Sequence, residues 1–110
     1  MNYSVIILPR AEFDFQRLYD YIKKRSKRGA DSWVNTFHRS LKRLHKQPDA
    51  LELAPESEDH AEDIRQLLFK TGQGLIYRAL FVIRDDIVFI IHIRGPGQDV
   101  ISPDDLRLPD

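Results

Sequence analysis

The spacing of apolar residues changes twice along this chain, and that order limits the folds that it can adopt. Tyr3 to Leu8 is a short β-branched run that ends at Pro9, as a strand would, because proline cannot donate to a sheet ladder. Two stretches with helical spacing follow, and the last third holds three apolar runs rich in β-branched and aromatic residues. This pattern predicts an α+β fold with the element order β-α-α-β-β-β.

The two stretches with helical spacing predict an antiparallel helix hairpin. The first begins at Pro9 and ends near Arg25, and its apolar stripe consists of Ala11, Phe15, Leu18 and Ile22. The second runs to Pro48, and its stripe consists of Ala30, Trp33, Val34, Phe37, Leu41 and Leu44. Because only a short loop joins them, both stripes are expected to pack on one face of the sheet.

The later apolar runs predict a three-stranded antiparallel meander. Their ranges are Ile64 to Phe69, Leu75 to Ile83 and Ile87 to Ile93, separated by Thr71-Gly72-Gln73-Gly74 and by Asp85-Asp86. Residues 48–63 show no regular spacing and predict an irregular loop. Residues 99–110, rich in proline and aspartate, are expected to form a loosely held tail after a domain of residues 1–98.

Composition excludes several classes of protein. The 110 residues suit one domain, and the absence of cysteine excludes disulfides, thiolate nucleophiles and cysteine-based zinc sites. No apolar run approaches the roughly 20 residues of a membrane helix, and the first residues lack the basic region of a signal peptide. We therefore expect a cytoplasmic protein that does not enter a membrane.

The net charge of zero hides a strong asymmetry between the two halves. Residues 1–50 carry 11 lysines and arginines against 5 acids, whereas residues 51–110 carry 6 against 12. A basic first half could attract nucleic acid or an acidic protein, but the acidic second half would oppose a long polyanion. Charge alone does not choose between these partners, so direct nucleic-acid binding stays open.

Four ionisable side chains in the predicted strands are candidates for binding a target: Arg65, Arg78, His92 and Arg94. A basic patch across neighbouring strands could hold phosphate, an RNA backbone or the carboxylates of a partner. The alternative for each arginine is a solvated or ion-paired side chain, and for the histidine a structural hydrogen bond. The four histidines show no ligand spacing and the glycines match no phosphate-loop motif, so neither a metal nor a cofactor is expected.

Five short segments carry a family resemblance through their order and spacing. They are Pro9-Arg10-Ala11-Glu12, Leu18-Tyr19-Asp20-Tyr21-Ile22, Ala54-Pro55-Glu56-Ser57, Ile64-Arg65-Gln66-Leu67 and Ile76-Tyr77-Arg78. With the predicted element order, they resemble the RelE/ParE toxin superfamily over roughly residues 3–98, most closely its ParE-like, plasmid-stabilisation branch. The resemblance implies the toxin of a type II toxin-antitoxin module, held silent by a ParD-like antitoxin.

The superfamily has two functional classes, and the strand residues favour one of them. RelE-like members cut messenger RNA on the ribosome with basic and aromatic residues on the sheet, whereas ParE-like members inhibit DNA gyrase. Arg65 keeps the first basic position, but Leu67 and Gly74 stand where the resemblance implies further basic residues, and no tyrosine follows Tyr77. Because attack by a ribose 2′-hydroxyl needs a proton acceptor and several cations, we favour a gyrase inhibitor that is not an enzyme and that arrests growth. No catalytic residue is assigned.

The basic first half is the expected surface for the antitoxin, whose segments the resemblance implies to be acidic and amphipathic. The candidate residues are Lys23, Lys24, Arg25, Lys27, Arg28, Arg39, Lys42 and Arg43. A solvated helix face is the alternative interpretation of the same residues. Two further functions stay open: a RelE-like ribosome-dependent endoribonuclease, and a non-toxic relic that only binds antitoxin.

Overall fold

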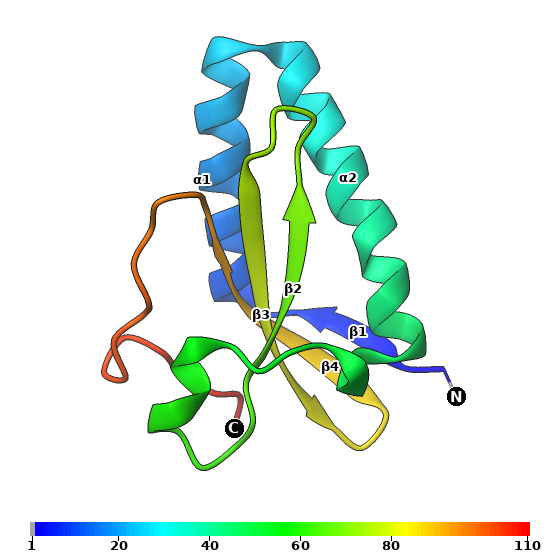
Figure 1. Cartoon of the computed structure of the whole chain (residues 1–110), viewed down its shortest axis with the longest axis vertical. Coiled ribbons are helices and arrows are strands. Elements are labelled where there is room, and N and C mark those ends of the chain that lie inside the picture. The colour runs from blue at the N-terminus through cyan, green and yellow to red at the C-terminus, as the bar shows by residue number, and fades with distance from the viewer. Residues whose placement is uncertain (1) are drawn as a thin grey trace.

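The computed structural model describes residues 2–110 and contains the predicted elements in the predicted order (Figure 1). They are β1 (Ser4–Ile7), α1 (Pro9–Arg25), α2 (Lys27–Lys46), β2 (Arg65–Lys70), β3 (Ile76–Arg84) and β4 (Ile87–Arg94). The segment predicted to be irregular holds two short 3-10 helices, η1 (Pro48–Ala50) and η2 (Pro55–Asp59). The α+β prediction and its element order are confirmed.

A single residue, Ser26, joins the two helices. Its backbone is extended, with φ −160° and ψ 109°, and its hydroxyl oxygen accepts a hydrogen bond of 2.9 Å from the Gly29 N–H. This is an N-cap, so the residue that ends α1 also supplies one of the missing hydrogen bonds in the first turn of α2. The two helices therefore form a long hairpin whose tip lies far from both chain termini (Figure 1).

The four strands form one mixed sheet in the order β1-β4-β3-β2. β2, β3 and β4 are antiparallel neighbours, as predicted, and β1 pairs in parallel with the first half of β4. The register between β3 and β4 shifts at Leu80/Phe81, where a bulge places Ile90 opposite Phe81 and His92 opposite Leu80. Because β1 ends early, the second half of β4 has a free backbone edge, which α1 covers.

The helix hairpin covers one face of the sheet and buries an aromatic core there. α1 packs over β4 and α2 over β2. Trp33 and Phe37 of α2 meet Phe15 of α1 and, on the sheet, Phe69 and Tyr77, with ring centroids 4.7 to 6.0 Å apart. The predicted stripes therefore face the sheet, and the centre of the molecule is held by dispersion and apolar burial.

The opposite face of the sheet carries a second, smaller apolar cluster, which corrects one expectation. The C-terminal segment is not loosely held, because Ile101 and Leu106 are 7% and 4% exposed. Both belong to an apolar cluster on this face, whose other buried members are Ala54, Ile64, Leu80, Val82 and Ile91. The sequence pattern missed this packing because two isolated apolar residues among proline and aspartate give no periodic signal.

Candidate functional site

The strand register divides the four predicted target-binding residues between the two faces of the sheet. Arg78 and Arg94 are direct cross-strand partners, whereas Arg65 lies opposite Phe81, a residue of the helix-side core. Because side chains alternate along a strand, Arg65 starts on the helix side of the sheet and Arg78 with Arg94 on the other. The structure therefore brings Arg78 and Arg94 together and leaves Arg65 apart from them.

Arg78 is held by a buried carboxylate. Its guanidinium donates two hydrogen bonds of 2.9 Å to the two oxygens of Glu56 and a third, also of 2.9 Å, to Gln66 Oε1. Glu56 is 1% exposed, and its Oε2 accepts a further bond of 3.0 Å from the Ile101 N–H. This ion pair therefore ties η2, β3 and the C-terminal segment together, and the contacts of Arg78 support a structural role.

Burial of Glu56 by itself raises the pKa of its carboxyl group. The hydrogen bonds from Arg78 and Ile101 and the charge of Arg78 outweigh it, so the pKa lies below its ordinary value of 4.5. Glu56 is therefore ionised at neutral pH. It lies in the Ala54-Pro55-Glu56-Ser57 segment and Arg78 in Ile76-Tyr77-Arg78, so two of the resemblance segments meet in this pair. The resemblance singles out the segment that contains Glu56, but the sequence does not show that this carboxylate pairs with Arg78, and sequence reasoning missed its role.

Arg65 and Arg94 also donate to groups of the protein itself. Arg65 Nη1 donates to the Leu51 carbonyl oxygen at 2.6 Å, and its Nη2 lies 3.9 Å from the exposed carboxylate of Asp63. Arg94 Nη2 donates to the Asp99 carbonyl oxygen at 2.5 Å. Both side chains are partly buried, and each anchors a loop to the sheet.

His92 lies in a buried polar cluster at the free edge of β4. It is 3% exposed, and its Nδ1 lies 3.3 Å from Oδ2 of Asp14, which is 7% exposed. The same oxygen accepts a hydrogen bond of 3.1 Å from the Ile93 N–H, while Arg10 Nε donates to Oδ1 at 3.1 Å. Asp14 thus accepts from one N–H of the edge that β1 leaves open, and His92 is enclosed beside it.

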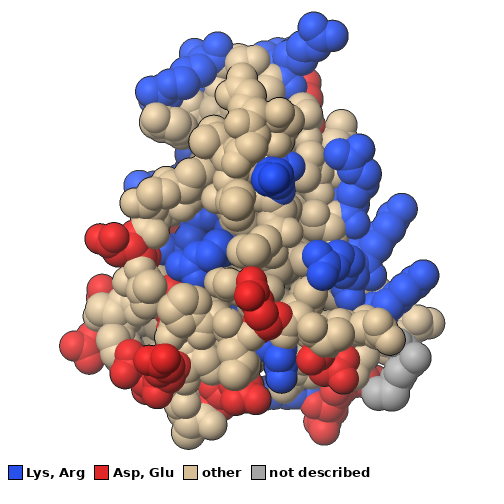
Figure 2. All heavy atoms as spheres, viewed as in Figure 1, with Lys and Arg blue, Asp and Glu red and all other residues tan. Residues whose placement is uncertain are grey.

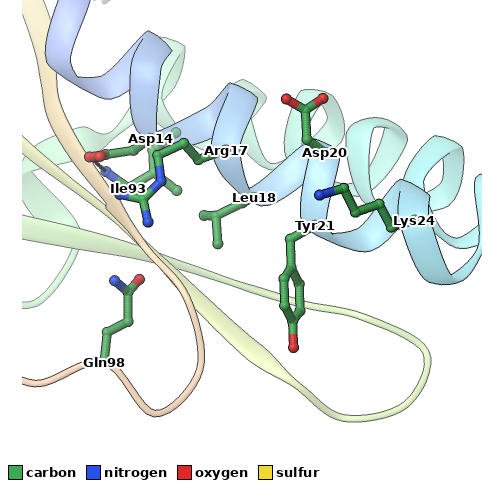
Figure 3. A pocket seen from close by; sticks show the side chains of 8 residues that line it. All are labelled: Asp14, Arg17, Leu18, Asp20, Tyr21, Lys24, Ile93 and Gln98. Carbon is green, nitrogen blue, oxygen red and sulfur yellow. Dashed lines mark hydrogen bonds between the residues drawn. The ribbon is translucent and has the colours of Figure 1, made fainter.

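A shallow pocket of about 360 Å³ lies beside this cluster. Figure 3 shows Asp14 and Leu18 pointing from α1 toward β4, and Gln98 entering from the loop after that strand. Burial raises the pKa of Asp14, but the contact with His92, the Ile93 N–H and the charge of Arg10 outweigh it, so the pKa lies below its ordinary value of 3.8. The carboxylate is therefore a charged structural acceptor and is not poised to take a proton near neutral pH.

The candidate antitoxin-binding residues lie on the outer surface of the helix hairpin. All eight are exposed, and among residues 2–110 none of them forms an ion pair within 4.0 Å. Figure 2 shows basic side chains at the hairpin tip and along one flank of the molecule, with acidic side chains gathered at the other end. The predicted charge asymmetry is therefore a spatial one, with a basic helix hairpin that is open to a partner.

The described part of the chain offers no group of three or more histidine, cysteine or acidic residues that could hold a metal ion. None of the helices within residues 2–110 is long and apolar enough to cross a membrane.

Comparison with known proteins places the chain in one family. The family model described as the ParE toxin of the type II toxin-antitoxin system, parDE, matches residues 5–100. No individual curated protein matches the chain. The family match spans both helices and the strands described above, except for Ser4 at the start of β1.

Proposed function

Because this chain belongs to the ParE toxin family of type II toxin-antitoxin systems, we propose that it binds a ParD-like antitoxin and, when free, inhibits DNA gyrase in the cytoplasm. The antitoxin would lie across the exposed basic surface of α1 and α2, where unpaired cations speed association with an acidic partner and select it. Released toxin would arrest growth and so stabilise a plasmid that encodes the pair.

One observation supports a target that is bound rather than cut. The four strand residues that could have assisted RNA cleavage all make internal contacts: Arg65 with Leu51, Arg78 with Glu56, His92 with Asp14 and Arg94 with Asp99. Cleavage by a 2′-hydroxyl requires a proton acceptor and cations that converge on one phosphate. Here the buried histidine faces a carboxylate, and Arg65 lies on the other face of the sheet from Arg78 and Arg94.

Controlled expression in bacteria tests the proposal. A gyrase inhibitor is expected to induce the DNA damage response and filamentation while transcripts stay intact. Messenger RNA cut at defined codon positions would identify a RelE-like ribonuclease instead. Normal growth with a retained antitoxin complex would identify a relic, and either of these outcomes would overturn the proposal.

Two substitutions then test the target-binding residues. Arg65→Ala and Arg94→Ala are expected to lower toxicity while binding of the antitoxin is kept, because neither lies on the helix hairpin. Arg107→Ala is the matched control, since Arg107 is an exposed arginine of the C-terminal segment. Growth arrest unchanged from the parent in both variants would remove Arg65 and Arg94 from the target-binding surface.

A further inference from the structure

A groove lies between the tip of the helix hairpin and the β2–β3 turn, at the edge of the aromatic core. It encloses about 570 Å³, and its walls include Tyr21, Arg25, Trp33, Thr71, Leu75 and Tyr77. We call it the hairpin groove. Its floor is aromatic, and its rim carries two exposed apolar side chains, Tyr21 and Leu75, which are 57% and 46% exposed.

Two buried polar atoms in the wall of the hairpin groove lack hydrogen-bond partners among residues 2–110. They are the indole Nε1 of Trp33, a residue only 1% exposed, and the hydroxyl oxygen of Thr71. An indole N–H can only donate, so it needs an acceptor oxygen, and a buried polar group without one is costly. The groove therefore offers hydrogen-bond donors next to an apolar floor.

The charged residue that lines the hairpin groove is basic. Arg25 lines the groove and lies over the Tyr21 ring, 3.9 Å from its centroid, and no carboxylate lines it. Lys23, Lys24, Lys27 and Arg28 lie near Arg25 in the sequence at the hairpin tip, and Figure 2 shows mostly basic side chains at that end of the molecule. An anionic acceptor would therefore be attracted to this groove and meet no repulsion from its walls.

The chain does not fill the hairpin groove with its own termini. The last residue, Asp110, accepts a hydrogen bond from Arg84 at 3.1 Å, and the Tyr3 N–H donates to the His45 carbonyl oxygen at 2.8 Å. Both termini lie at the opposite end of the molecule from the hairpin tip (Figure 1). Neither end of the described chain therefore occupies the groove.

We propose that the hairpin groove anchors an acidic, amphipathic peptide segment of the antitoxin, an inference that rests on the proposed function. An apolar side chain of the segment packs against Trp33 and Tyr77, and a neighbouring carboxylate accepts hydrogen bonds from Trp33 Nε1 and Thr71 Oγ1 beside Arg25. The turn that carries Thr71 moves outward to admit it, which Gly72 and Gly74 favour. A nucleic acid fits less well, because the single arginine in the groove matches one carboxylate and not a chain of phosphates.

Trp33 makes the test direct, since it is the only tryptophan of the chain. The toxin is co-purified with the protein encoded by the adjacent reading frame, and the dissociation constant is measured for the parent, Thr71→Val and Arg25→Gln. The matched control is Lys46→Gln, which removes one charge from the far end of α2. We expect Thr71→Val and Arg25→Gln each to weaken binding about tenfold, Lys46→Gln to stay within about twofold, and Trp33 emission to shift on binding.

A double-mutant cycle identifies the carboxylate. Aspartates and glutamates of the partner are changed one at a time to asparagine or glutamine, and one of them is expected to show no further loss in the Thr71→Val background. A complex with unchanged Trp33 emission and equal affinity for all variants would overturn the groove assignment alone. Absence of any complex would overturn the proposed function with it. If a single-stranded oligonucleotide shifts Trp33 emission and the shift is lost in Arg25→Gln, the groove binds nucleic acid, and the peptide assignment is overturned.

Discussion

Replacing Glu56 by glutamine removes one negative charge from its buried ion pair with Arg78. Glutamine has the same shape and can still accept the hydrogen bond from Ile101, but it can satisfy only one side of the Arg78 guanidinium. The side chains of Glu56 and Arg78 are 0% and 17% exposed, so water cannot replace the lost partner. Breaking a buried pair typically costs roughly 3–5 kcal/mol, and we expect about 3 kcal/mol here because one bond survives.

The loss is measured by urea denaturation followed by far-ultraviolet circular dichroism. A change of this size lowers the midpoint of thermal unfolding by about 10 to 15 °C in a domain of this length. Glu62→Gln is the control, because Glu62 also makes a two-oxygen contact with an arginine, Arg84, but both side chains are partly exposed. We expect a much smaller loss for Glu62→Gln, since solvent screens an exposed pair.

The pH dependence of the same variant gives an independent check. The pKa of Glu56 is lower in the folded protein than its ordinary value of 4.5, so its stabilisation is present above that value and is lost as pH falls through the folded pKa. The difference in unfolding free energy between parent and Glu56→Gln is therefore expected to shrink in acid. If Glu56→Gln unfolds within about 1 kcal/mol of the parent at neutral pH, the ion pair does not hold the C-terminal segment as argued.

Three further substitutions have expected outcomes. Leu106→Ala should lower the unfolding free energy by about 2 kcal/mol and increase binding of a hydrophobic dye, since it opens the cluster on the far face; a loss below about 0.5 kcal/mol would mean that the segment is not packed there. Ser26→Ala should lose about 1 kcal/mol in chemical denaturation by removing the cap on Gly29, whereas Ser26→Asn should stay close to the parent. Asp14→Asn should destabilise the protein at neutral pH and progressively less below the ordinary pKa of 3.8, because the folded pKa is lowered; a difference that grows in acid would contradict the charged contacts around Asp14.

The fold could be predicted from the sequence because each element carries a strong local signal. Proline at the start of α1, the two apolar stripes and the β-branched runs place every helix and strand within a few residues of its observed bounds. The parallel pairing of β1 with β4 follows from no local pattern, since it joins segments more than 80 residues apart. No sequence pattern predicts the bulge beside Leu80 either. It shifts the pairing of β3 with β4, so that His92 lies opposite Leu80 while Ile90 lies opposite Phe81.

The site was harder to predict because the role of a charged side chain depends on its nearest opposite group. The sequence shows Arg78 as a charge in an apolar strand, and only the structure brings Glu56, 22 residues earlier, within 2.9 Å of it. The same holds for Asp14, whose hydrogen bond with the Ile93 N–H joins residues 79 positions apart and whose contact with His92 is similarly distant in sequence. The basic surface of the helices, by contrast, could be predicted, because helical spacing alone determines which residues point outward.

The most direct test of the account compares two reactions with the same purified protein. One is supercoiling of relaxed plasmid by DNA gyrase, and the other is cleavage of messenger RNA on translating ribosomes, each measured with and without the antitoxin. We predict that the free protein blocks supercoiling, that the antitoxin restores it and that transcripts stay intact. Cleaved transcripts with unaffected gyrase would contradict the account, since the strand residues that we assign to internal contacts would then be acting on RNA.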